Sequence, residues 1–508
     1  MASFVSKVAP ADSYLVAAGG DKAHLALGES LNDPGDRDVP VPREWDSRGR
    51  YVMLEHLFFP QEVAVYWENG DYIVHNVKVS SWGLFNQEEL NIYQTLRNHE
   101  TVAQAAKRLT SAPETISRVV LRALFNRLAF TNKDDERDSV TQSEEVLRSK
   151  PDVPTPSAAY LVMTLRCNLS CTYCYAESGP HISVQGDLTM EEYKSVLQQV
   201  KELGVRTVIF TGGEPFTRSD MVELISYAKS LGLRTNAISN GRIINKALVE
   251  RLIGILDKVT ISIDSMGPEV HDHNRGKFSH HYAMRALQYF METPITVNVN
   301  STLTNVIETD DYLTLNTFLR NKGVKHKTLF LTEIGRGDVD VQGIPLERQM
   351  EIQQGILDNE TALANNSPVG TDAILLPLTI RNHCGAGTAE FSIDPKGNVF
   401  PCKLLHDSKF LAGNLRESPL KDIWEFAPTL RELRGTTMET LPNCLPCSFR
   451  FICGGSCRAS VYGRTNDLHA TLTEECPSLR RQLRHNLWAS ARSSLAPTPM
   501  LESREDLC

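Results

Sequence analysis

Cys167-Asn-Leu-Ser-Cys171-Thr-Tyr-Cys174 is the stretch that decides the fold of this 508-residue chain. It follows an apolar segment, Tyr160–Leu165, which we expect to form a β-strand, so one short loop at a strand end carries three thiols. A 4Fe–4S cluster normally takes four cysteines, and a three-cysteine loop therefore leaves one iron open to another molecule. A structural zinc loop is the alternative, but zinc sites usually show paired CxxC knuckles and a nearby fourth ligand, which this segment lacks.

Apolar strands alternate with amphipathic helices after this loop. The predicted strands are Thr207–Phe210, Arg234–Ser239, Lys258–Asp264, Thr296–Thr302 and Thr328–Thr332, and the predicted helices include Met190–Leu203, Met221–Leu231 and His280–Met291. Six β/α units in series predict an α/β fold with a parallel sheet, curved into a partial (β/α)6 TIM-like barrel with its chemistry at the strand C-terminal ends.

The CxxxCxxC spacing with an aromatic residue, Tyr173, before the third cysteine resembles the signature of the radical S-adenosylmethionine (SAM) superfamily. The resemblance covers roughly Tyr160–Thr332. It implies that the open iron chelates the amino and carboxylate groups of SAM and passes an electron to its sulfonium, which releases a carbon radical.

Other residues after the strands are similar to SAM contacts of that family. Thr211-Gly212-Gly213-Glu214-Pro215 resembles its GGEP motif, in which the backbone and the carboxylate hold the SAM ammonium. An ordinary turn would also explain the two glycines, and a serine that ends a strand is often a turn former. The cofactor-binding residues that the resemblance implies are Tyr173, Gly212, Gly213, Glu214, Asn240, Ser262 and Arg275.

Seven further cysteines fall between Cys384 and Cys476, in an order that resembles the SPASM extension of peptide- and protein-modifying radical SAM enzymes. The resemblance implies a distal auxiliary cluster and a nearer one, held by Cys444, Cys447, Cys453 and Cys476, and by Cys384, Cys402 and Cys457. A zinc ribbon would use Cys444, Cys447, Cys453 and Cys457 and leave three cysteines idle. Because the nearer group has three cysteines, its fourth position is either open for substrate or filled by a non-cysteine ligand.

Residues 51–132 predict a small winged-helix domain. Two strands, Glu62–Trp67 and Tyr72–Val79, flank the hairpin signal Asn69-Gly70, and helices are expected over Asn86–Leu96, Val102–Leu109 and from Pro113 onward. The pattern resembles the domain that captures leader peptides by strand addition in maturases of ribosomally made peptides. A DNA-binding helix-turn-helix is the alternative, in which Arg118, Arg122 and Arg127 would face phosphates, although a solvated helix face also explains these arginines.

Composition sets the remaining boundaries. The polar stretch up to Pro156 predicts a linker. The predicted division is 1–50 unassigned, 51–132 peptide-recognition-like domain, 133–156 linker, 157–370 radical SAM core, 371–480 SPASM domain and 481–508 tail with an unassigned Cys508.

A net charge of −9 argues against nucleic acid or an anionic membrane as the general partner. No apolar run approaches the ~18 residues of a membrane span, and the N-terminus has no secretory signal, so a cytoplasmic location is expected. Eleven cysteines in such a chain are better explained as metal ligands than as disulfides.

The prediction is therefore a radical SAM maturase of a ribosomally synthesised peptide, similar to sactisynthase-type enzymes. The implied cofactors are SAM and three 4Fe–4S clusters, and the implied partners are a precursor peptide and a flavodoxin- or ferredoxin-type electron donor. A 5′-deoxyadenosyl radical would abstract hydrogen, and an intrapeptide cross-link would follow, with a carbon–sulfur thioether favoured.

Three other functions stay open at this point. They are formylglycine-type oxidation of a protein residue, carbon–carbon cross-linking of a peptide and an iron–sulfur redox sensor that binds DNA. No catalytic base can be chosen, because Asp264, Glu333 and Arg336 at the barrel mouth fit SAM binding or structure equally well.

Overall fold

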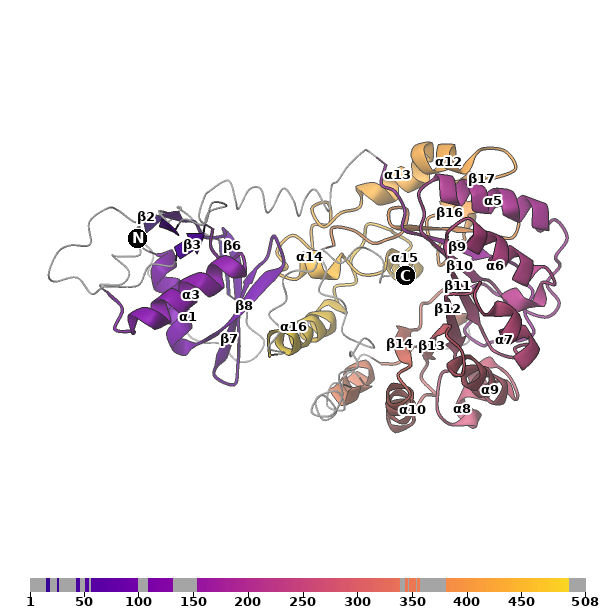
Figure 1. The fold of residues 1–508 in the computed structure, drawn as a ribbon, viewed down its shortest axis with the longest axis horizontal. Coiled ribbons are helices and arrows are strands. Elements are labelled where there is room, and N and C mark those ends of the chain that lie inside the picture. Colours follow the sequence, from indigo (N-terminus) through magenta and orange to yellow (C-terminus); the bar gives the residue numbers. More distant parts are fainter. Residues whose placement is uncertain are drawn as a thin grey trace.

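The computed structural model describes residues 15–18, 25–26, 43–45, 51–53, 56–98, 108–130, 153–338, 343–345, 347–352, 354–356 and 381–492. The N-terminal sheet and its helices lie at one end of the molecule and the barrel at the other, with the C-terminal helices α14 and α16 next to the N-terminal sheet (Figure 1). In the described part of the chain, no helix is both long enough and apolar enough to cross a membrane.

The N-terminal domain is built on an antiparallel sheet in the order β1-β6-β7-β8. Its strands are β1 (Leu15–Ala18), β6 (Glu62–Glu68), β7 (Asp71–Asn76) and β8 (Ser81–Asn86), and the short pairs β2–β5 and β3–β4 join Leu25–Ala26 to His56–Leu57 and Arg43–Trp45 to Tyr51–Met53. The predicted hairpin is confirmed, since Asn69 and Gly70 both have positive φ in the turn between β6 and β7. The sequence analysis missed β8 and the strands before residue 51.

Two predicted helices cover one face of this sheet. In α1 (Gln87–Arg97) the Asn86 side chain accepts from the Glu89 amide, and the Glu89 carboxylate accepts from the Asn86 amide, which completes a capping box. Helix α3 (Pro113–Phe125) begins with proline, as predicted. Most of the helix predicted over Val102–Leu109 lies outside the described residues.

Six parallel strands form the predicted barrel sheet, in the order β14-β13-β12-β11-β10-β9. They are β9 (Ala158–Val162), β10 (Thr207–Thr211), β11 (Arg234–Ser239), β12 (Lys258–Ser262), β13 (Thr296–Leu303) and β14 (Lys325–Phe330). The covering helices are α5 (Met190–Glu202), α6 (Met221–Ser230), α7 (Lys246–Leu252), α8 (Pro268–Arg275), α9 (Ser279–Met291) and α10 (Thr309–Asn321), and η1 (Pro215–Thr217) and η2 (Gly335–Asp338) are short 3-10 turns. The fold class is therefore as predicted, with strand ends shifted by a few residues.

Alternate residues of each barrel strand face opposite sides. Ala159 and Leu161 of β9 belong to the large core between sheet and helices, whereas Ala158 and Tyr160 pack with Ile209 on the inner face. This inner face is where a reaction chamber would lie.

The C-terminal region extends the barrel sheet. Strand β15 (Glu390–Ile393) pairs in parallel with β9 and is followed by β16 (Asn398–Phe400) and β17 (Gly413–Asn414). Among the described residues, this extended barrel sheet therefore has nine strands. The other elements are η3 (Ser408–Phe410), α12 (Leu420–Phe426), α13 (Pro428–Gly435), α14 (Arg450–Cys453), α15 (Arg458–Thr465) and α16 (Cys476–Arg492).

Two predicted boundaries need correction. Helix α16 includes residues 481–492, which the sequence analysis assigned to a tail, because its Leu483, Leu487 and Trp488 are buried. Residues 153–156, at the end of the predicted linker, pack on the barrel, where Trp424 Nε1 donates to the Pro154 carbonyl at 2.7 Å.

The N-terminal sheet also packs on the C-terminal region through its second face. Ala64 and Tyr66 share one hydrophobic core with Phe449 and Ile452, and the Tyr66 and Phe449 rings stack 5.3 Å apart. The Tyr66 hydroxyl donates to Ser448 Oγ at 2.9 Å. The sheet is therefore buried between its own helices and the cysteine-rich domain.

Candidate iron–sulfur and SAM site

The first cysteine group lies in the loop that follows β9. The pKa of the Cys167 thiol is raised to about 12 and that of Cys171 to about 11, chiefly by burial and in part by the neighbouring thiols of the loop. Such thiols stay protonated at neutral pH unless a cation stabilises the thiolates. The loop therefore fits an iron cluster that supplies this positive charge.

The two glycines of the GGEP-like motif pack directly against this loop. Gly212 has φ of 138°, and a Cβ there would lie 2.4 Å from the Thr164 carbonyl oxygen. A Cβ on Gly213 would lie 2.4 Å from the Arg166 carbonyl oxygen and 2.9 Å from Cys167 Cβ. Both positions therefore require glycine because their backbone lies against the backbone of the cysteine loop.

Glu214 is a buried carboxylate with hydrogen-bond donors but no cation beside it among the described residues. Its oxygens accept from Ser239 Oγ at 3.1 Å and from the Asn240 and Phe216 amides at 2.8 and 3.3 Å. Burial raises its pKa to about 7, although these hydrogen bonds lower it. An ammonium group would satisfy this carboxylate, so Glu214 fits the predicted SAM contact.

We expect SAM affinity to depend on pH through Glu214. Below about pH 7 the carboxyl is protonated and must lose its proton to pair with an ammonium, so affinity should fall by up to tenfold per pH unit below 7 and level off above 8. Equilibrium SAM binding to the reconstituted protein from pH 6 to 9 measures this, and Glu214→Gln, matched for iron content, should lack this component. Identical pH profiles for the two proteins would exclude the assignment.

Asn240 links Glu214 to the cysteine loop. Its side-chain Nδ2 donates to Asn168 Oδ1 at 2.8 Å and lies 3.6 Å from Cys167 Sγ. Ser262, at the end of β12, is half-buried and pairs in register with Asn300 of β13. The structure thus places Asn240 against the cluster loop, and Ser262 on a neighbouring strand of the same sheet.

Arg275 and Tyr173 meet at Asp264, just beyond β12. The Arg275 guanidinium binds both Asp264 oxygens at 2.8 Å, and the Tyr173 hydroxyl donates to Asp264 at 2.5 Å. Burial alone would raise the pKa of Asp264, but Arg275 holds it below its ordinary value. Arg275 therefore keeps both N–H groups of Nη1 and the second N–H of Nη2 for the SAM carboxylate that the resemblance implies, and Asp264 is a positioning residue.

Arg336 fastens the cysteine loop from the opposite edge of the barrel. Its Nε and Nη2 donate to the carbonyl oxygens of Cys171 and Ser178, each at 2.9 Å, and its amide donates to the Cys174 carbonyl. The sequence analysis named Arg336 only as a candidate of undefined role. Its contacts join residues more than 150 positions apart, which no local pattern reveals.

The seven C-terminal cysteines separate into the two predicted groups. Burial raises the pKa of each described thiol in these groups for which a shift is resolved, and other cysteines of the same group raise it further. Glu390 also raises the pKa of Cys402 and of Cys457. The near group is Cys384, Cys402 and Cys457, and the distal group is Cys444, Cys447, Cys453 and Cys476.

Two side chains lie between neighbouring groups. Tyr175 is close enough to Cys174 and Cys402 for both to raise its pKa after burial does. Burial lowers the pKa of Arg381, and the nearby Cys384 and Cys453 raise it in part. The three groups therefore form a series from the barrel to the C-terminal domain.

In the part of the chain that the structure describes, no three His, Cys, Asp or Glu side chains converge on a point that could hold one metal ion.

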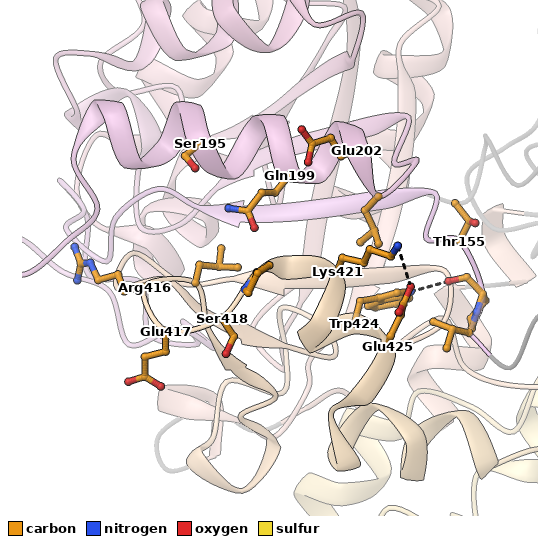
Figure 2. A pocket seen from close by; sticks show the side chains of 15 residues that line it. Thr155, Ser195, Gln199, Glu202, Arg416, Glu417, Ser418, Lys421, Trp424 and Glu425 are labelled. Carbon is orange, nitrogen blue, oxygen red and sulfur yellow. Dashed lines mark hydrogen bonds and ion pairs between the residues drawn. The ribbon is translucent and has the colours of Figure 1, made fainter.

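A cleft of about 890 Å³ lies elsewhere, on the outer side of the barrel between α5 and α12. Figure 2 shows Gln199 and Glu202 on one side of it and Lys421, Trp424 and Glu425 on the other. None of the predicted site residues lines it, so we place the chemistry at the cysteine groups and not in this cleft.

Comparison with protein families supports both parts of the site. Residues 161–315 match the radical SAM superfamily, and residues 384–448 match SPASM, an iron–sulfur cluster-binding domain. The first range contains Cys167, Cys171 and Cys174. The second contains four of the seven C-terminal cysteines, which are Cys384, Cys402, Cys444 and Cys447.

Several characterised proteins are similar to the barrel and C-terminal regions. An AdoMet-dependent heme synthase of Methanosarcina barkeri is 28% identical, with 60% of this chain and 92% of the relative covered. The mycofactocin maturase MftC of Mycobacterium ulcerans is 31% identical, with 59% and 82% covered, and the PqqA peptide cyclase of Rhizobium meliloti is 27% identical, with 71% and 97% covered.

Among solved structures, SuiB of Streptococcus suis bound to the precursor peptide SuiA has a TM-score of 0.53 at 17% identity. The likeness covers 82% of this chain and 98% of that one, which is more than residues 153–508 can supply. The shared fold therefore extends into the N-terminal domain.

Proposed function

Because the chain belongs to the radical SAM superfamily and is an enzyme with SAM and 4Fe–4S clusters as cofactors, we propose that it matures a ribosomally made peptide by an intrapeptide cross-link. The bound cofactor supplies a 5′-deoxyadenosyl radical that removes a hydrogen atom from the substrate. The favoured product is a thioether between a cysteine sulfur and a carbon of the same peptide. The carbon loses its hydrogen atom to the radical, the thiol loses its proton, and an auxiliary cluster would take up the remaining electron.

The observation that carries this proposal is the N-terminal sheet docked on the cysteine-rich domain with β8 at its edge. An edge strand offers unpaired backbone groups to an extended peptide. MftC and the PqqA peptide cyclase carry names of peptide-modifying enzymes, and SuiB was solved with a precursor peptide.

The arginines of α3 favour peptide over DNA. Arg122 binds Glu89 at 2.8 Å and also donates to the Leu84 carbonyl of β8 at 2.7 Å, and Arg118 lies 3.9 Å from Glu89. Arg118 and Arg122, two of the three arginines considered for phosphate contacts, thus face the buried Glu89 carboxylate. A leader peptide would add at β8, the edge strand of this sheet.

The near cysteine group supports the thioether as the favoured bond. Cys384, Cys402 and Cys457 would supply three of the four ligands of a cluster, so one ligand position is left that no cysteine of this group fills. A substrate thiolate bound there would be held next to the barrel interior, where hydrogen abstraction takes place. Tyr175, between Cys174 and Cys402, separates the two ends of this space.

Mass spectrometry tests the proposal directly. A small cysteine-bearing peptide encoded beside this gene would be incubated anaerobically with the reconstituted protein, SAM and a reductant. Loss of two hydrogens together with deoxyadenosine formation is the expected result, and fragmentation would locate the bond. Deoxyadenosine without a change in the peptide would reject the choice of substrate.

Strand addition at β8 predicts an alternating dependence on peptide amides. Leader peptides N-methylated at every second residue should lose at least tenfold in affinity in one register and little in the other, because only alternate amides face the partner strand. Competition fluorescence anisotropy with the full-length protein measures both. Equal losses in the two registers would exclude strand addition.

This test is cleaner than deletion of residues before Pro156. Removal of the N-terminal domain would expose Phe449, Ile452 and Trp488, which share a core with its sheet. Loss of activity after such a deletion would therefore not distinguish lost recognition from a damaged C-terminal domain.

A further inference from the structure

The near auxiliary group has three cysteines, and an acidic residue from β15 lies beside the segments that carry two of them. Glu390 is the first residue of β15 and pairs in register with Ala158 of β9. Ala158 belongs to the inward-facing row of the barrel, whereas Phe391 packs in the core beneath the outer helices. The register therefore directs the Glu390 side chain toward the barrel interior.

Glu390 lies beside the segments that carry two members of the group. A Cβ on Gly385, next to Cys384, would lie 3.9 Å from Glu390 Cγ. The Gly387 amide donates to the carbonyl oxygens of both Glu390 and Pro401, the residue before Cys402. Ala386 and Cys402 share one hydrophobic core, against which Cys384 packs.

Within the described residues, the Glu390 carboxylate makes no hydrogen bond and no ion pair shorter than 4 Å. The charges that act on it are Lys403 and Lys327, and Lys403 Nζ lies 4.7 Å from the centre of the Tyr160 ring. Glu390 keeps a partly accessible side chain, and Cys457 is exposed.

We propose that Glu390 is the fourth, non-cysteine ligand of the near auxiliary cluster. Carboxylate oxygens are established iron ligands, and a carboxylate binds a thiolate-rich cluster more weakly than cysteine does. Glu390 would close the site in the resting enzyme and leave it when a stronger ligand arrives. This inference goes beyond the proposed function, because it holds for any substrate.

Mössbauer spectroscopy of the auxiliary clusters alone tests it. A parent protein with Cys167, Cys171 and Cys174 all changed to alanine keeps only the near and distal groups and is loaded anaerobically with ⁵⁷Fe. We expect one iron site with an oxygen-ligand signature, loss of that signature in Glu390→Gln, and an all-thiolate spectrum in Glu390→Cys. Glu417→Gln, an exposed acidic residue of the same domain, should leave the spectrum unchanged.

An unchanged spectrum in Glu390→Gln at equal iron content would overturn the proposal. An all-thiolate spectrum in the parent would overturn it as well. The measurement uses neither SAM nor peptide, so the proposed peptide substrate can fail while this assignment stands, and the reverse.

Discussion

Asp264→Asn is expected to destabilise the barrel around β12 by about 3–5 kcal/mol, because it leaves the buried Arg275 guanidinium without its carboxylate. Asp264 is buried and Arg275 nearly so, and the two side chains join through two hydrogen bonds of 2.8 Å. Tyr173 would lose its acceptor at the same time, so the cysteine loop should loosen. Anaerobic hydrogen exchange with mass spectrometry should show exchange roughly a hundredfold to several-thousandfold faster in residues 258–275.

Two controls make this expectation specific. The double variant Asp264→Asn, Arg275→Gln removes both charges and should recover part of the loss, because the cost of an unpaired buried charge disappears. Glu223→Gln breaks an exposed ion pair with Arg251 in the same barrel and should change stability by less than about 0.5 kcal/mol. If the double variant is less stable than Asp264→Asn, the unpaired charge is not the cause.

Removal of one cysteine from each group is expected to separate their roles. Cys171→Ala should lose about four irons and lower deoxyadenosine formation at least ~1000-fold, because this group binds SAM. Cys384→Ala and Cys447→Ala should each lose about four irons, keep SAM cleavage and fail to form the product. Iron analysis, electron paramagnetic resonance and product analysis measure these outcomes.

Cys508→Ala is the matched control, because Cys508 belongs to none of the three groups. It should keep full iron content and activity. A Cys457→Ala protein that loses the distal cluster and keeps the near one would show that the near group is wrongly composed.

The sequence was sufficient for the barrel and the hairpin because both depend on local signals. Alternation of apolar strands with amphipathic helices predicted the six parallel strands, and Asn69-Gly70 predicted the turn between β6 and β7. Strand β8 was missed, since its Gly83 and its run of aromatic and apolar residues lead straight into the cap of α1. Nothing local reveals that β15 pairs with β9.

The same difference separates the site residues. The family resemblance carried the predicted grouping of the ten cysteines and the choice of Glu214, because those motifs lie in short segments. The roles of Asp264 and Arg336 depend on contacts with Tyr173 and Cys171, which are 91 and 165 residues away in the sequence. A role for Glu390 could not be predicted from the sequence for the same reason, since only the register of β15 against β9 directs its side chain toward the barrel interior.

The shared core between the N-terminal sheet and the cysteine-rich domain has a consequence for damage by oxygen. Cys447 and Cys453 of the distal group pack against the hydrophobic core that contains Ala64 and Tyr66. Arg450 binds both the Cys447 carbonyl and the Glu62 carboxylate. Loss of iron from the distal group would loosen the surface on which the N-terminal domain rests. Loss of iron confined to the distal group would then weaken substrate binding while the SAM-cleaving group stays intact, and SAM would be consumed without product.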